Sequence, residues 1–251
     1  MEKLKLKHGR DYFSPSQLKK LTVSLGAFNS YLNKARYSSS AMDLGTLVHT
    51  LFLERDKFDE RYFILDDSDI IKEIGGARPT STKKYSEWKD IQTQLAEGRE
   101  LISNSLLETA EGIYDRACML GVIDSFFTDG EAEKTIRGEV TDFDTPFDAL
   151  AIIDYDAPFN SVDLKTTSKP LDKFKWDADT FGYDIQARLT QAMNGKEFIF
   201  VVVQTVEPYD IGVFTTSEYF LDRGKDKINK ALANYEFYED NYSSQILSFE
   251  L

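Results

Sequence analysis

Asp163 and Lys165 carry opposite charges two residues apart within the stretch 161-SVDLKTT-167. If this stretch is a strand, both side chains point to the same face of the sheet. Asp148 lies in the preceding apolar run, 146-PFDALAII-153, so carboxylates from two neighbouring strands can converge on one cation. Mg²⁺ prefers one or two carboxylates with water and phosphate oxygens, and a nearby lysine orients the attacking water or stabilises charge on the phosphate. The pattern predicts metal-assisted cleavage of a phosphodiester; the alternative is a solvated strand with a surface salt bridge.

Length and composition indicate a globular protein with one substantial core. The chain has 251 residues, of which 41% are hydrophobic and 13% aromatic. A net charge of −13 argues against binding nucleic acid over the whole surface, although it is compatible with a local basic groove. The single cysteine, Cys118, cannot form an internal disulfide, and neither a membrane-spanning run nor the apolar core of a signal peptide is present. We therefore expect a cytoplasmic protein.

The first half of the chain has mainly helical patterns. The segment 14-SPSQLKKLTVSLGAFNSYL-32 opens with a serine N-cap and a proline at the first helical position. Apolar residues at helical spacing predict a second helix over 40–54. The polar, glycine-containing segment 66–85 is interpreted as a mobile loop, and helices resume over roughly 85–120.

From residue 131 the pattern changes to β-rich runs that are separated by turn residues. A helix over 179–195, closed by Asn194-Gly195, interrupts these runs, and a last helix is predicted over 217–242. The order predicts an α/β or α+β domain with a central sheet flanked by helices. We expect one domain over 1–251, made of a mainly helical part, a sheet with a crossover helix and a C-terminal helix, at 1–130, 131–217 and 218–251.

Asp148 followed by 163-DLK-165 resembles the bipartite motif of the PD-(D/E)xK nuclease superfamily. Pro146-Phe147-Asp148 stands in place of the usual proline-aspartate. Four further stretches, in the expected order, resemble the RecE-like and lambda-exonuclease-like branch. They are its N-terminal start, its G-x-x-x-H helix, its glutamine helix and the following strand pair, here 14-SPSQLKKL-21, 45-GTLVHTLFLE-54, 183-YDIQARLTQAM-193 and 200-FVVVQTVEPYDIGVF-214.

The resemblance implies a restriction-endonuclease-like core with a central mixed β-sheet, and a metal site within it. Asp148 and Asp163 would hold Mg²⁺, for which Mn²⁺ substitutes, together with the backbone carbonyl of Leu164 and with His49. A histidine on the apolar face of a helix is otherwise a buried structural residue, and Gly45 would let its helix approach the sheet or a phosphate closely.

The resemblance also assigns catalytic roles around the metal. Lys165 would position the water, and Gln186 would orient Lys165 or the phosphate. The family has a glutamate on the strand before the first aspartate, for which we choose Glu133, with Glu131 and Glu139 as alternatives.

Other residues are candidates for contact with DNA. The branch usually has a tyrosine four residues after the glutamine, where this chain has Thr190, and Tyr183 is a candidate to take its place sterically. Basic and aromatic residues after the lysine strand and in the glycine-containing loop are suited to contact phosphates or stack on a base; a solvated surface is the alternative. The DNA-binding candidates are Tyr183, Lys169, Lys173, Lys175, Trp176 and Arg78.

The function implied by the resemblance is a hydrolase of phage recombination that digests one strand of linear double-stranded DNA processively, 5′→3′. It also implies a homo-oligomeric ring (trimer or tetramer), a single-strand annealing protein as partner, and a phage or prophage source acting in the bacterial cytoplasm. The alternatives are a structure-specific or single-strand DNA endonuclease of the same fold, and a non-catalytic acidic interaction protein with a decayed nuclease fold. Metal binding and the need for a DNA end discriminate among them.

Overall fold

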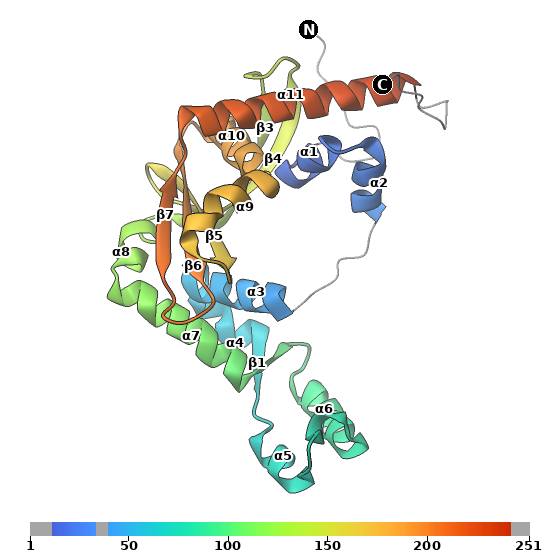
Figure 1. Ribbon diagram of the computed structural model, residues 1–251, viewed down its shortest axis with the longest axis vertical. Helices are drawn as coiled ribbons and strands as arrows, with labels where there is room; N and C mark the ends of the chain where they lie inside the picture. The colour runs from blue at the N-terminus through green and yellow to red at the C-terminus, as the bar shows by residue number, and fades with distance from the viewer. Residues whose placement is uncertain (1–11, 34–39, 242–251) are drawn as a thin grey trace.

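The computed structural model describes residues 12–33 and 40–241, which build a five-stranded sheet with helices on both faces and a projecting helical arm (Figure 1). This confirms the predicted α/β class with a mixed central sheet. Neighbouring strands are antiparallel except for β5 and β6, which are parallel and joined through helices α9 (Phe174–Thr180) and α10 (Tyr183–Asn194). The strands lie in chain order across the sheet: β3 (Glu131–Val140), β4 (Phe147–Asp156), β5 (Asn160–Thr167), β6 (Glu197–Gln204) and β7 (Ile211–Thr215).

The pairing of β4 with β5 is short, and this creates an opening in the sheet. A tight turn at 157–159 pairs Tyr155 with Val162 and Asp156 with Ser161, and the ladder between these two described strands ends there. The ladder between β3 and β4, by contrast, runs along almost their full length. Strands β4 and β5 therefore diverge beyond the Tyr155–Val162 pair.

One face of the sheet packs on α3 (Ser40–Leu53) and α7 (Asn104–Met119). Leu47 and Val48 of α3 join Leu164 of β5 in this core. A Cβ atom on Gly45 would lie 3.3 Å from the hydroxyl oxygen of Thr166, so this glycine allows α3 to approach β5 closely.

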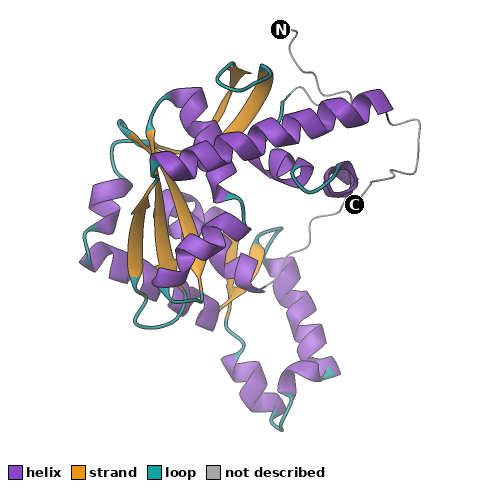
Figure 2. Ribbon diagram, turned by 45° about the horizontal axis from the view of Figure 1, so that its top comes forward, coloured by secondary structure: helices purple, strands orange, loops and turns teal. Residues whose placement is uncertain are grey.

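The other face is covered by helices from both ends of the chain (Figure 2). Phe198 and Phe200 of β6 pack there with Phe174, and Ile185 packs in a second cluster with Tyr235. A left-handed Gly195 ends the crossover helix, as predicted. The helices of this face are α1 (Pro15–Leu21), α9 (Phe174–Thr180), α10 (Tyr183–Asn194) and α11 (Glu218–Asn241).

The single helix expected over 14–32 is in fact two helices, α1 and α2 (Leu25–Asn33). Ser14 caps α1 with a capping box that includes Gln17, as the serine–proline start predicts. The break occurs because Ser24 accepts a hydrogen bond from the backbone N–H of Ala27 and so begins a new helix.

The segment 66–85, expected to be a mobile loop, contains α5 (Ser68–Ile74) and the start of α6 (Lys83–Leu95). Thr82 caps α6, and the hydroxyl of Tyr85 donates a 2.6 Å hydrogen bond to Asp67, which joins the two helices into the arm. Two short parallel strands at its base, β1 (Tyr62–Leu65) and β2 (Glu100–Ser103), were not predicted. The remaining short elements are η1 (Arg55–Lys57), α4 (Phe58–Arg61), η2 (Pro79–Ser81), α8 (Val122–Phe126) and η3 (Leu171–Lys173).

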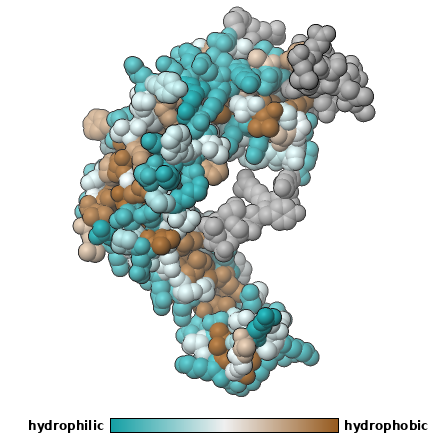
Figure 3. All heavy atoms as spheres, viewed as in Figure 1, coloured by the Kyte–Doolittle hydropathy of each residue, from teal (hydrophilic) through white to brown (hydrophobic). Residues whose placement is uncertain are grey.

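Hydrophilic residues cover most of the visible surface of the arm and of α11, and apolar residues gather near α8 and at the base of the arm (Figure 3). No helix among the described residues is long and apolar enough to cross a bilayer. The start of the chain, where a signal peptide would lie, is almost entirely outside the described residues.

Candidate active site

The opening between β4 and β5 is lined by acidic side chains. Asp154 precedes the last paired residue of β4, and the strand register places it across from Asp163 of β5. Its Oδ2 accepts a 2.8 Å hydrogen bond from the backbone N–H of Leu164. A side-chain carboxylate thus satisfies a backbone donor that the diverging ladder leaves without a backbone acceptor on β4.

Asp163 is almost fully buried, with 1% of its surface exposed. Its Oδ1 accepts a 2.5 Å hydrogen bond from Nε2 of Gln186 on α10, and its Oδ2 lies 2.5 Å from Nζ of Lys165. Burial raises the pKa of Asp163 to about 6; the charge of Lys165 opposes this rise and the negative charge of Asp154 adds to it. The protonated form of Asp163 is therefore more favoured than in an ordinary aspartate, even beside Lys165.

Lys165 is the cation of the site. Burial by itself lowers the pKa of Lys165, but the negative charges of Asp163 and Asp154 outweigh it, so the pKa is raised and the ammonium form is favoured. Its Nζ lies 5.1 Å from the ring centroid of Tyr183, which contributes a cation–π contact. Thr190, one turn beyond Gln186 on α10, is buried.

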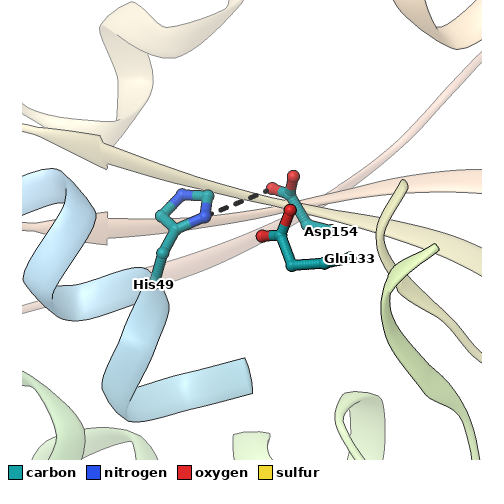
Figure 4. A group of neighbouring side chains, drawn as sticks. All are labelled: His49, Glu133 and Asp154. Atoms are coloured by element: carbon teal, nitrogen blue, oxygen red, sulfur yellow. Dashed lines mark ion pairs between the residues drawn. The ribbon is translucent and has the colours of Figure 1, made fainter. Parts of the chain in front are cut away.

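His49 and Glu133 complete the acidic side of the opening (Figure 4). Nε2 of His49, on α3, donates a 2.8 Å hydrogen bond to the carbonyl of Leu164, and Nδ1 lies 3.8 Å from Oδ2 of Asp154. Glu133 has a left-handed backbone with φ 52°, a strained conformation for a residue with a side chain. Burial and the charge of Asp154 raise the pKa of Glu133.

These residues fit a divalent cation. One ligand atom from each of His49, Glu133 and Asp154 lies within 4.8 Å of the others. Carboxylate oxygens and an imidazole are suitable ligands for Mg²⁺ or Mn²⁺. Burial is the main cause of the raised pKa values of Glu133 and Asp163, and the negative charge of Asp154 adds to both.

Most of the predicted site residues come together in the structure. His49, Asp163, Lys165 and Gln186 meet at the opening, with the carbonyl of Leu164 held by His49. Of the three candidate glutamates it is Glu133 that lies beside Asp154. Glu131 pairs in register with Asp156 and contacts Lys134, and Glu139 pairs with Asp148.

Asp148 requires a correction. It lies six residues before Asp154 on β4, which at about 3.3 Å per residue places it about 20 Å further along the strand. Because β4 and β5 are joined by the turn at 157–159, Asp154 and not Asp148 lies across from Asp163. Counting equal steps outward from this turn would have identified Asp154 in the sequence.

The candidate DNA contacts lie in different parts of the structure, and only some of them are close to Lys165. Lys169 and Tyr183 line a pocket of about 240 Å³ beside Lys165, with Lys169 Nζ 2.6 Å from Asp177. Trp176 is 63% exposed. The other basic residues contact neighbours in sequence or lie on the arm: Lys173 (3.4 Å from Asp172), Lys175 (5.2 Å from the Trp176 ring) and Arg78.

Solved structures with a similar fold include a candidate exonuclease from Eubacterium rectale, with a TM-score of 0.58 at 16% identity over 96% of this chain and 91% of that one. A phage related exonuclease from Haemophilus somnus 129PT has a TM-score of 0.34 at 12% identity over 73% of this chain and 98% of that one. The alkaline exonuclease LHK-Exo from Laribacter hongkongensis has a TM-score of 0.30 at 13% identity over 75% of this chain and 96% of that one. The TM-scores of the last two structures are too low to support an inference.

No curated protein is similar enough in sequence to add to these structural likenesses. A family model described as a PDDEXK-like domain of unknown function (DUF3799) matches residues 14–242. The match spans nearly the whole chain, so the protein belongs to this PD-(D/E)xK nuclease-fold family.

Proposed function

We propose that the protein is a divalent-metal-dependent deoxyribonuclease that digests one strand of linear duplex DNA from an end, 5′→3′. The observation that carries the proposal is the meeting of Asp154, Asp163 and Lys165 at the point where β4 and β5 diverge. Membership in a nuclease-fold family and the fold shared with the candidate exonuclease from Eubacterium rectale support it.

The residues that would hold the ion are His49, Glu133, Asp154 and Asp163. A bound Mg²⁺ or Mn²⁺ lowers the pKa of a coordinated water and neutralises charge on a phosphate oxygen. The protein's own groups then have separate tasks. Lys165, favoured as an ammonium ion, stabilises negative charge on the phosphate as the water attacks.

Two further side chains position the reacting groups. Gln186 is a positioning residue, because its amide fixes one oxygen of Asp163 while Lys165 binds the other. His49 holds the carbonyl of Leu164 and so connects α3 to the strand that carries Asp163 and Lys165. The tight fit of Gly45 against Thr166 keeps α3 close enough for this contact.

The broader proposal includes Mg²⁺ as the working metal with Mn²⁺ as a substitute, a ring of three or four copies, a single-strand annealing protein as partner and action in the bacterial cytoplasm. These parts rest on the resemblance of the sequence to the RecE-like branch. A ring with basic residues lining its channel would reconcile processive digestion with the net charge of −13.

The test is digestion of linear duplexes labelled at either the 5′ or the 3′ end, with Mg²⁺ or with EDTA. We expect metal-dependent loss of the 5′ label as mononucleotides, and no digestion by the Asp163→Asn variant. Early release of the 3′ label would reverse the proposed direction, and cleavage of sealed circles would favour an endonuclease. A wild-type protein that cleaves no DNA and takes up no Mn²⁺ in calorimetric titration would contradict the proposal.

A further inference from the structure

A cleft of about 860 Å³ leads into the candidate active site from the side of the N-terminal helices. Its wall is formed by residues at and near α1 and α2, among them Tyr12 and Tyr31. Its floor is the face of the β3–β4 ribbon that carries Leu150 and Ile152, and it reaches Lys165. The volume lies within the range of clefts that bind small molecules.

The floor of this cleft is apolar and open. Ile152 is 51% exposed although it lies in the middle of a strand, and Tyr31 on the wall is 38% exposed. Ile152 is two residues before Asp154, so both side chains point to the same face of β4. The apolar floor is therefore continuous with the acidic opening, and the flat face of a nucleobase is a suitable group to cover it.

One further cation, Arg137, lines the cleft, and another, Lys19, lies close enough to Lys165 to feel its charge. Arg137 pairs in register with Leu150 on the floor and is exposed. Lys19 lies on α1, with its Nζ 5.7 Å from the ring centroid of Phe181; burial and the charges of Lys20 and Lys165 lower the pKa of Lys19. Within the part of the chain that the structure describes, neither Arg137 nor Lys19 forms an ion pair with a carboxylate.

In this chain 43 acidic residues outnumber 30 basic ones. Some lysine residues elsewhere on the surface have carboxylates within ion-pair distance, as Lys134 and Lys196 do with Asp156. Cations that stay free of carboxylates beside a phosphodiester site are available to phosphate groups.

We propose that the cleft between α1, α2 and the β3–β4 ribbon, here called the strand cleft, binds a single strand of DNA with its bases unpaired. The bases lie on Tyr31 and Ile152, and the phosphates lie near Arg137 and Lys19 on the way to Lys165. This inference rests on the proposed function, because it assigns the substrate strand to the same site. A base that stacks on a tyrosine ring is no longer paired with its complementary base. The enzyme therefore requires unpaired nucleotides on this side of the scissile phosphate.

The test is equilibrium binding of a fluorescein-labelled 12-nucleotide oligothymidine in EDTA, where no cleavage occurs, measured by fluorescence anisotropy at several salt concentrations. We expect Tyr31→Ala to weaken binding by at least about 5-fold, the loss of about 1 kcal/mol or more of base stacking. Arg137→Gln should weaken binding and reduce the slope of log K against log salt by about 0.7. A blunt hairpin of the same length should bind more weakly, and Tyr31→Ala should leave its binding unchanged.

The matched control is Lys230→Gln. Lys230 is exposed on α11, on the side opposite to the buried Ile228 and Ala231, and the substitution removes the same charge. Binding by Tyr31→Ala and Arg137→Gln that equals binding by Lys230→Gln would overturn the strand cleft. Circular dichroism melting establishes that each variant is folded.

The cleavage assay on the same proteins separates the two proposals. If the wild-type protein digests linear duplex and the cleft variants bind and cleave like the control, the proposed function stands and the strand cleft is wrong. If the wild-type protein cleaves nothing and takes up no Mn²⁺ but the cleft variants bind single strands more weakly, the strand cleft stands and the proposed function is wrong.

Discussion

Asp154→Asn should abolish metal-dependent cleavage and at the same time stabilise the metal-free protein. Asparagine has the same shape and keeps an oxygen that can accept the hydrogen bond from the backbone N–H of Leu164. It removes a negative charge from a position whose charge raises the pKa values of both Glu133 and Asp163. Loss of function and gain of stability therefore have one cause, which is the removal of unneutralised charge.

The size of the stability gain follows from the separation of the carboxylates. Ligand atoms of Glu133 and Asp154 lie within 4.8 Å. Two like charges at that distance repel by about 1 kcal/mol in a water-like environment and by about 3 kcal/mol at an effective dielectric of 20. Glu133 is partly open to solvent, which favours the lower figure. For a chain of this size 1 kcal/mol corresponds to a rise in Tm of about 2–4 °C.

Replacement of a metal ligand should reduce cleavage at least as much as replacement of an outer partner, for which losses of about 10- to 100-fold are usual. The measurements are calorimetric titration with Mn²⁺, release of labelled nucleotides from linear duplex, and thermal unfolding in EDTA. Asp148→Asn is the matched comparison: it makes the same change on the same strand and should retain metal binding and cleavage. Loss of both in Asp148→Asn, with Asp154→Asn active, would refute the assignment from strand register.

Three further predictions concern charges in and near the opening. Lys165→Met should reduce cleavage by at least about 100-fold while calorimetry still detects Mn²⁺, because its ammonium acts on the phosphate. Gln186→Leu should lower cleavage by about 10- to 100-fold, because it removes the amide that binds Asp163. Gln186→Asn should retain more activity than Gln186→Leu if its shorter side chain still brings the amide to Asp163. Hydrogen bonds from Lys134 and Lys196 outweigh burial and lower the pKa of Asp156 below its usual 3.8. The ionised Asp156 therefore contributes its full stabilisation above pH 3.8, and this contribution is lost as the pH falls further. In urea unfolding at a series of pH values, the free energy of unfolding of Asp156→Asn should fall less steeply below pH 3.8 than that of the wild-type protein.

Residues on regular elements were predictable from the sequence. Asp163 and Lys165 share a face because they are two apart on a strand, and Gln186 faces them because the crossover helix returns over that face. His49 was predicted from the resemblance to the G-x-x-x-H helix, whose glycine, Gly45, fits against Thr166. In each case one periodic element determined which way the side chain points.

The partner of Asp163 was not predictable in the same way, because it depends on how two strands are paired. β4 carries Asp148, Asp154 and Asp156, and alternation alone leaves all three on one face. The tight turn before β5 determines which of them meets Asp163. Asp156 is paired with Ser161 next to the turn, and Lys134 and Lys196 neutralise its charge.

The arm was missed for a different reason. Segment 66–85 is polar and contains Gly75 and Gly76, which suggested a loop, yet its helices are formed by local capping at Thr82 and by the hydrogen bond between Tyr85 and Asp67. No residue of α5 or α6 is buried. An apolar stripe that packs on the core was therefore the wrong signal to search for here.

The site is costly to fold without a cation. Glu133 adopts a left-handed backbone within a strand, and burial together with neighbouring charge raises the pKa values of Glu133 and Asp163. A structure that retains such strain requires a compensating interaction, and a divalent ion would relieve the charge repulsion at once. Since an ion that binds the native state alone stabilises it in proportion to its excess over Kd, Mn²⁺ should raise the Tm of the wild-type protein. The same addition should leave the Tm of Asp154→Asn unchanged, because that variant has lost a carboxylate ligand and no longer binds the ion.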